Sequence, residues 1–160
     1  MRTRARQRGV TMVEFAIVGT AAMIVLFAVI EVGRAMFVVN TLNEVTRRSA
    51  RMAAVCPIND PAIREVGLFN SPGDGTGSRF ISGLAPGNLT LEYLNQNGDP
   101  ITDPSANFGQ IHFVRTRIVG YQHEMLIPFL NQLFTTPEFG TTLRRDTQAL
   151  PPQQGAVLPC

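Results

Sequence analysis

The stretch VTMVEFAIVGTAAMIVLFAVI, residues 10–30, decides how this chain is built. It has the length needed to cross the hydrocarbon core of a bilayer, about 30 Å at a rise of about 1.5 Å per residue. Glu14 is its one ionisable residue. A buried core helix of a soluble protein is the alternative, but the rest of the chain offers too little apolar sequence to surround such a helix. The sequence therefore predicts a transmembrane helix over residues 10–33.

The charges on either side of this segment predict its orientation. Arg34 follows the apolar run, but Glu31 lies one turn before it and can pair with it. The segment before the run has no acidic residue and four arginines, Arg2, Arg4, Arg6 and Arg8. Because basic residues stay on the cytoplasmic side, we expect a cytoplasmic amino terminus and a carboxy-terminal domain outside the cytoplasm.

The same four arginines account for the basic character of the chain. Without them ten basic and twelve acidic residues remain, so the formal net charge moves from +2 to −2. No dense basic patch with interleaved aromatic residues follows, and we expect no nucleic-acid partner.

The junction between the basic leader and the apolar run has its own pattern. A secretory signal peptide would need a shorter apolar run and a small-residue cleavage site before a change in composition, and neither is present. Instead RQRG is followed by VTMVEF, so that Gly9 ends the leader and Glu14 is the fifth residue after it.

This junction resembles the processing site of type IV prepilins, and the residues after it narrow the resemblance. The segments that match are Glu14-Phe15, the EVGR block from Glu31 to Arg34, and Ser49-Ala50-Arg51. They resemble the amino-terminal signature of TadE-like proteins, the minor pilins and pseudopilins of tight-adherence, Flp-type pilus systems. The resemblance covers about the first third of the chain.

The resemblance implies a processing step and a set of partners. A prepilin peptidase would cut between Gly9 and Val10 on the cytoplasmic side, removing a leader of residues 1–9. Glu14 would then meet the new amino group of Val10, in its own or a neighbouring subunit. Other partners would be pilin subunits, bound through the amino-terminal helix, the inner-membrane assembly platform and the lipid bilayer. The alternative for Glu14 is hydration near the cytoplasmic interface, since carboxylates inside membranes are costly.

Beyond the membrane, residues 34–56 predict an amphipathic continuation of the same helix. Apolar and small residues recur there at alternating steps of three and four. This packing stripe consists of Ala35, Val38, Leu42, Val45, Ser49, Met52 and Cys56. We expect one helix from about Thr11 to Val55, ending where Pro57 restricts Cys56. A coiled coil is the alternative for the stripe.

Residues 57–160 predict a small head domain outside the cytoplasm. Asp60 and Pro61 begin a short helix over AIREVGLF, and SPGDGTGS after it is expected to be a flexible loop. LTLEYL from Leu89 and QIHFVRTRIVGY from Gln110 predict two antiparallel strands. MLIPFLNQLF predicts a short helix or apolar loop, TTLRRDTQAL a third strand, and PPQQGAVLPC an extended tail. The predicted fold class is α+β, a long helix packed on a small antiparallel sheet, as in pilins.

Two cysteines, Cys56 and Cys160, end the long helix and the chain. In an oxidising compartment a disulfide between them would tie the tail to the helix. An intermolecular bond and a free terminal thiol are the alternatives.

No residue pattern predicts catalysis, and we expect neither an enzyme nor a cofactor or metal. His112 and His123 are the two histidines, and they fit structural or solvated roles. Asp74, Asp99 and Asp103 lie in turn-rich segments, but they lack the alternating spacing of a calcium-binding loop.

The sequence therefore favours a minor pilin or pseudopilin that takes part in priming or tip assembly of a tight-adherence pilus. A type II secretion pseudopilin or a type IVa pilin is a second hypothesis, disfavoured by Val10 after the junction and by the EVGR block. A membrane-tethered periplasmic binding or enzymatic domain, with an uncleaved anchor, is the alternative of another class.

Overall fold

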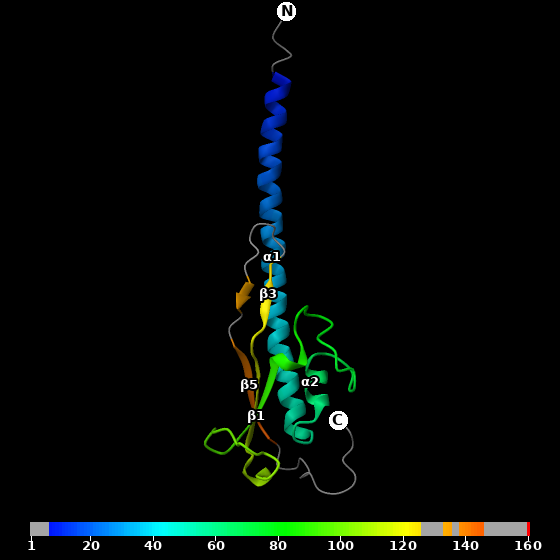
Figure 1. Cartoon of the computed structure of the whole chain (residues 1–160). Coiled ribbons are helices and arrows are strands. Elements are labelled where there is room, and N and C mark those ends of the chain that lie inside the picture. Colours follow the sequence, from blue (N-terminus) through cyan, green and yellow to red (C-terminus); the bar gives the residue numbers. More distant parts are fainter. Residues whose placement is uncertain (1–6, 126–132, 136–137, 146–159) are drawn as a thin grey trace, which may run out of the picture.

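The computed structural model describes residues 7–125, 133–135, 138–145 and 160. One helix, α1 (Gln7–Val55), projects from a small head that packs along its second half (Figure 1). The head contains the helix α2 (Pro61–Gly67), a three-stranded antiparallel sheet and a two-stranded antiparallel sheet. The α+β class predicted from the sequence is confirmed, with a long apolar helix packed on a small antiparallel sheet.

The bounds of α1 differ from the prediction at one end. It begins at Gln7 rather than at about Thr11, because nothing between these positions breaks a helix and an isolated glycine costs only about 1 kcal/mol relative to alanine. It ends at Val55 as predicted, and the N–H of Cys56 closes the last turn on the carbonyl of Met52 at 2.8 Å.

The second half of α1 turns its stripe toward the head. Leu42, Val45 and Ser49 are completely buried, and Val38 is nearly so. Ala35 and Met52 are half-buried at the edges of the contact. Val38, Leu42 and Val45 share one hydrophobic core with residues of the head, namely Leu68, Ile81, Leu84, Leu89, Ile118 and Tyr121.

The three-stranded sheet has the order β1 (Leu89–Leu94), β2 (Phe113–Ile118), β5 (Phe139–Arg144). β1 and β2 pair antiparallel, as the sequence predicts. On β2 the alternate residues Val114, Thr116 and Ile118 are buried. The buried hydroxyl of Thr116 donates to the carbonyl of Thr46 at 2.8 Å, so the middle strand is hydrogen-bonded directly to α1.

Two short strands were not predicted. β3 (Gln122–Glu124) pairs antiparallel with β4 (Leu133–Thr135), and β3 lies beside α1 (Figure 1). The segment predicted as a short helix or apolar loop, residues 125–134, therefore ends in a strand; its residues 126–132 lie outside the described residues. β5 begins at Phe139, two residues before the predicted third strand. The rest of that prediction and the extended tail, residues 146–159, also lie outside the described part.

The helix α2 begins as predicted and packs unusually closely on α1. The carboxylate of Asp60 accepts a hydrogen bond from the N–H of Ala62 at 2.9 Å, which caps the helix start. At the other end, a Cβ atom added to Gly67 would lie 1.8 Å from Oγ of Ser49. Glycine is therefore required at this crossing of the two helices.

The glycine-rich loop after α2 is held by side chains, rather than being simply flexible as expected. The carboxylate of the buried Glu65 accepts hydrogen bonds from the backbone N–H groups of Gly73 and Gly75. The side-chain amide of Asn70 donates to the carbonyls of Thr76 and Gly77, at 2.8 and 3.1 Å.

A second hydrophobic cluster surrounds the end of α1. Its buried members are Ala53, Cys56, Ile63, Tyr93, Ile111 and Val114. Cys56 forms a disulfide with Cys160, with their Cα atoms 5.9 Å apart. The link therefore ties the end of the chain to the end of α1.

The buried guanidinium of Arg145 lies against the aromatic residues of this cluster. Its centre is 4.4 Å from the ring centroid of Phe108 and 5.9 Å from that of Tyr93. Burial lowers the pKa of Arg145 and raises the pKa of the Tyr93 phenol, which keeps the phenol neutral near pH 7. Within the described residues the guanidinium makes no hydrogen bond, so its contacts there are with ring faces.

We expect Gly67→Ala to lower the free energy of unfolding by roughly 1–3 kcal/mol, because the added methyl group collides with Ser49. Adding Ser49→Ala to this variant should restore part of the loss. Gly87→Ala is the matched control, since a Cβ at Gly87 meets nothing within 4 Å. The measurement is urea unfolding in mild detergent micelles, followed by circular dichroism. An unchanged unfolding midpoint for Gly67→Ala would show that the helices are not in this close contact.

We expect Cys160→Ser to lower the free energy of unfolding, because the disulfide closes a loop with a sequence separation of 104. The chain-entropy model gives roughly 4–5 kcal/mol for such a loop, an upper value for real proteins. The variant should unfold at the same urea concentration as the reduced native chain. Equal midpoints for the oxidised and reduced native chain would contradict the expected role of this bond.

Candidate functional site

The first half of α1 is the candidate site, because its side chains are left without cover by the head (Figure 1). By length and composition, it is the one helix in the described part of the chain that can cross a membrane; its apolar window has a mean hydropathy of 2.5 and is not buried within the molecule. Residues 10–33 extend about 36 Å at 1.5 Å per residue, enough for a hydrocarbon core of about 30 Å. The exposed apolar surface therefore fits a membrane anchor.

Gly9 and Val10 lie in the first turns of α1, and both are exposed. A Cβ atom at Gly9 would meet nothing within 4 Å. The first four N–H groups of a helix have no partner within it, so the start of a helix opens easily. The peptide bond between Gly9 and Val10 is thus exposed near the start of the helix.

Glu14 is exposed on α1 and makes no hydrogen bond or ion pair with residues 7–125. It lies four residues after Val10, and residues four apart in a helix lie on the same face. The structure therefore places the carboxylate one turn from the backbone nitrogen of Val10. In a membrane, this carboxylate would need a partner or water.

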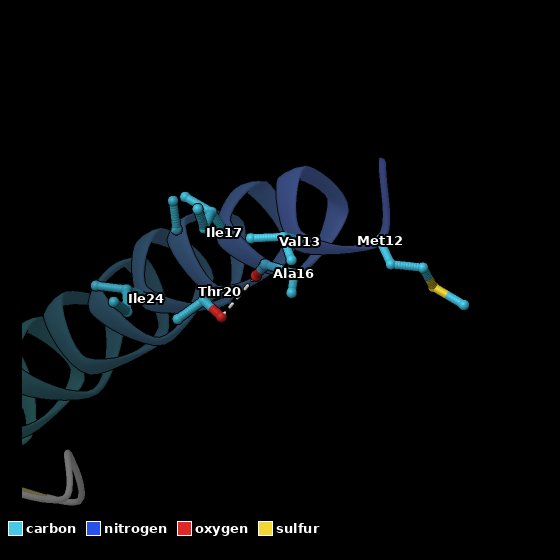
Figure 2. Close-up of a pocket in the computed structure, with 7 residues that line it drawn as sticks. Met12, Val13, Ala16, Ile17, Thr20 and Ile24 are labelled. Carbon is cyan, nitrogen blue, oxygen red and sulfur yellow. Dashed lines mark hydrogen bonds between the residues drawn. The ribbon is translucent and has the colours of Figure 1, made fainter. Parts of the chain in front are cut away.

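One face of the bare helix is slightly hollow (Figure 2). Its lining combines the small side chains Ala16, Thr20 and Ala21 with the larger Val13, Ile17 and Ile24. The hydroxyl of Thr20 donates to the carbonyl of Ala16 at 2.8 Å, the dashed line in Figure 2. The hollow is therefore apolar, and small residues at such a face allow another helix to approach closely.

Where the bare segment ends, α1 carries an ion-pair cluster, the exit cluster. Nη1 of Arg34 lies 3.0 and 3.1 Å from the two carboxylate oxygens of Glu31, the pair that the sequence predicts. Glu31 is buried, and Nε2 of His123 on β3 lies 3.6 Å from its Oε1. The sequence did not predict this role of His123, because nothing local links a histidine in the head to the end of the apolar segment.

Tyr121 lies next to this cluster, at the start of β3. Burial raises the pKa of its phenol, while the nearby positive charge of Arg34 acts in the opposite direction. The phenol is therefore neutral near pH 7, and no additional charge is buried at the exit.

The residues considered for catalysis or metal binding are dispersed. In the described part of the chain, no group of three His, Cys, Asp or Glu side chains could hold a metal ion. Asp74 pairs with Arg79 at 2.8 Å, and Asp103 accepts hydrogen bonds from the backbone N–H groups of Ser105 and Ala106. Asp99 lies in the turn closed by Asn95. His112 is half-buried beside β2.

Comparison with known proteins identifies the same segment of α1. The family model described as TadE-like protein matches residues 9–51. No curated protein matches the chain, and no solved structure does. The matched residues run from Gly9 through the bare helix and the cluster of Glu31 and Arg34 to Ser49 and Arg51 in the packed half. Residues 9–51 are therefore similar to TadE-like proteins, the family that the residue pattern of this segment resembles.

Proposed function

We propose that this chain is a minor pilin or pseudopilin of a tight-adherence pilus and acts in priming or tip assembly. It would be a single-pass protein of a bacterial inner membrane, with residues 10–33 in the bilayer and residues 57–160 as a head in the periplasm, or outside the cell after assembly. The observation that carries the proposal is the bare apolar half of α1, which has one exposed carboxylate close to the processing junction.

Processing after Gly9 would supply a positively charged partner for the carboxylate of Glu14. Cleavage before Val10 would create a new α-amino group, with a typical pKa of about 7.7–8.0, on the same helix face as Glu14. Pairing of the carboxylate with this ammonium, in its own or a neighbouring subunit, would offset the cost of burying either charge among apolar helices. A pair between subunits would also fix how far each helix is shifted along the next.

The hollow of Figure 2 supports helix association as the mode of assembly. In a bilayer, lipid chains are as apolar as leucine, so helices associate through close packing and polar pairs. Ala16, Thr20 and Ala21 would provide the close approach, and Glu14 the polar pair. The prepilin peptidase and the inner-membrane assembly platform are the further partners that this mode of assembly requires.

Two other functions are the alternatives, and one of them differs from the proposal at the amino terminus. A type II secretion pseudopilin or type IVa pilin would also be processed, but would be incorporated in another machine. A membrane-tethered binding or enzymatic domain would keep its leader. Intact mass separates the last of these from the pilin functions.

We expect the mature chain in cells with the prepilin peptidase to be lighter by residues 1–9, and the chain from cells without it to keep them. Gly9→Leu should block processing because it alters the cleavage site. It should not disturb the protein itself, because a Cβ atom at Gly9 meets nothing within 4 Å. Gly19→Leu is the matched control, as a Cβ at Gly19 also meets nothing within 4 Å. Intact-mass spectrometry of membrane and sheared-pilus fractions makes the measurement. A full-length native chain in peptidase-containing cells would refute the proposal.

We expect Glu14→Ala to leave membrane insertion intact and to reduce incorporation into sheared pili by about tenfold or more, because truncating one partner of a buried charge pair costs roughly 2–5 kcal/mol. Glu44→Ala is the control, because Glu44 lies on the same helix beyond the membrane-spanning part. Quantitative immunoblots of both fractions give the ratio. Normal incorporation of Glu14→Ala would exclude the carboxylate from assembly.

A further inference from the structure

A cleft of about 460 Å³ lies between α1 and the part of the head nearest the amino-terminal half of the helix. Three segments form its walls: α1 just after the exit cluster, the loop before β1, and β3. The side chains that matter for its chemistry are Arg34, Phe37, Phe80, Ser82, His123 and Glu124.

The depth of the cleft follows from the proposed membrane topology, on which this inference rests. Phe37 lies four residues beyond residue 33, about 6 Å further along the helix axis. Between the hydrocarbon core of about 30 Å and the full bilayer of about 40–45 Å, each headgroup layer is roughly 5–7 Å thick. The cleft therefore lies at the depth of the phospholipid headgroups outside the cytoplasm.

The charges of the cleft are one positive and one negative. Arg34 contacts Glu31 through Nη1 alone, so Nε and Nη2 have no hydrogen-bond partner in the described part of the chain. Glu124 is exposed at the end of β3. Guanidinium groups bind phosphate through paired N–H donors, and a carboxylate accepts from an ammonium group. The cleft thus suits a zwitterion that carries a phosphate and an ammonium.

Two exposed aromatic rings border the same space. Phe37 is 53% exposed and Phe80 is 59% exposed, although both are large apolar side chains. Phe80 packs edge to face on Phe69 with ring centroids 5.3 Å apart, and the guanidinium of Arg48 covers Phe69 at 4.5 Å. The ring of Phe80 is therefore held in place rather than loosely exposed. Aromatic faces attract ammonium groups and are common at membrane interfaces.

His123 supplies an independent observation. It is 7% exposed, lines the cleft, and its Nε2 makes no hydrogen bond within the described residues. The 3.6 Å between this atom and Glu31 is too long for a hydrogen bond. A buried polar atom without a hydrogen bond is costly, and a phosphate oxygen in the cleft would satisfy it in the tautomer that carries its proton on Nε2.

We propose that this cleft binds the headgroup of one phosphatidylethanolamine molecule. Its phosphate contacts Arg34, with Ser82 and His123 as further donors, and its ammonium lies between Phe37 and Phe80 at Glu124. Phosphatidylglycerol has no cation for Glu124. Phosphatidylcholine has a cation, but its quaternary ammonium carries no N–H group for the carboxylate.

The test is native mass spectrometry of the full chain released from nanodiscs that contain equal amounts of phosphatidylethanolamine, phosphatidylglycerol and phosphatidylcholine. We expect one retained lipid, with phosphatidylethanolamine at least about tenfold enriched over either of the others, which corresponds to about 1.4 kcal/mol. Glu124→Gln should remove most of this preference, and Phe80→Ala should weaken retention. Glu138→Gln is the matched control, an exposed carboxylate outside the cleft.

Equal retention of the three lipids, or an unchanged preference in Glu124→Gln, would overturn the proposal. Both changed side chains are exposed, so each variant should fold, and circular dichroism is the check. Because the readout is lipid retention, it is independent of pilus assembly. Glu14→Ala should keep the lipid even where incorporation is lost, so failure of the lipid site and failure of the pilin function give different results.

Discussion

The structure depends on one continuous helix that has to satisfy two environments. Along its first half α1 is apolar all round, and along its second half it is apolar on one side. Burial of Val38, Leu42 and Val45 holds the head on the second half, and the hydrogen bond from Thr116 to the carbonyl of Thr46 joins the middle strand to the same surface. Because α1 is one unbroken helix, these contacts with its second half also fix the position of the head relative to the bare first half.

The point where the two environments meet is marked by charge. A buried carboxylate such as Glu31 is stable only with close partners. Arg34 on the same helix donates to both of its oxygens, and His123 on β3 lies 3.6 Å away. The approach of His123 to Glu31 places β3 beside α1 at this level. Among the described residues, the side chains of α1 before Glu31 are almost all exposed, and this bare segment is long enough to cross a bilayer.

The sequence predicted the elements whose patterns are local. The apolar run, the stripe from Ala35 to Cys56, the Asp60 cap and the alternation in β1 and β2 each lie within one stretch of chain, so periodicity and capping identified them. β3 and β4 are three residues each, too short for any periodicity. The bonds from Glu65 to the glycine loop, the contact of Gly67 with Ser49 and the approach of His123 to Glu31 depend on residues that only folding brings together. For the candidate site, local pattern identified Gly9, Val10 and Glu14, whereas the cleft is formed by three segments that are distant in the sequence.

The bare half of α1 also constrains how subunits would associate if the proposed assembly is correct. Moving this helix from lipid to a bundle of similar helices exchanges one apolar contact for another. Apolar area alone therefore contributes little to helix association and does not determine how the helices are oriented or aligned. The hollow at Ala16, Thr20 and Ala21 would select which face of the helix meets a neighbour. The carboxylate of Glu14, closer to the amino end, would select the axial position, because only some shifts bring it to an ammonium group. A helix that otherwise presents uniform apolar surface would thus specify a defined arrangement through one small-residue face and one charge.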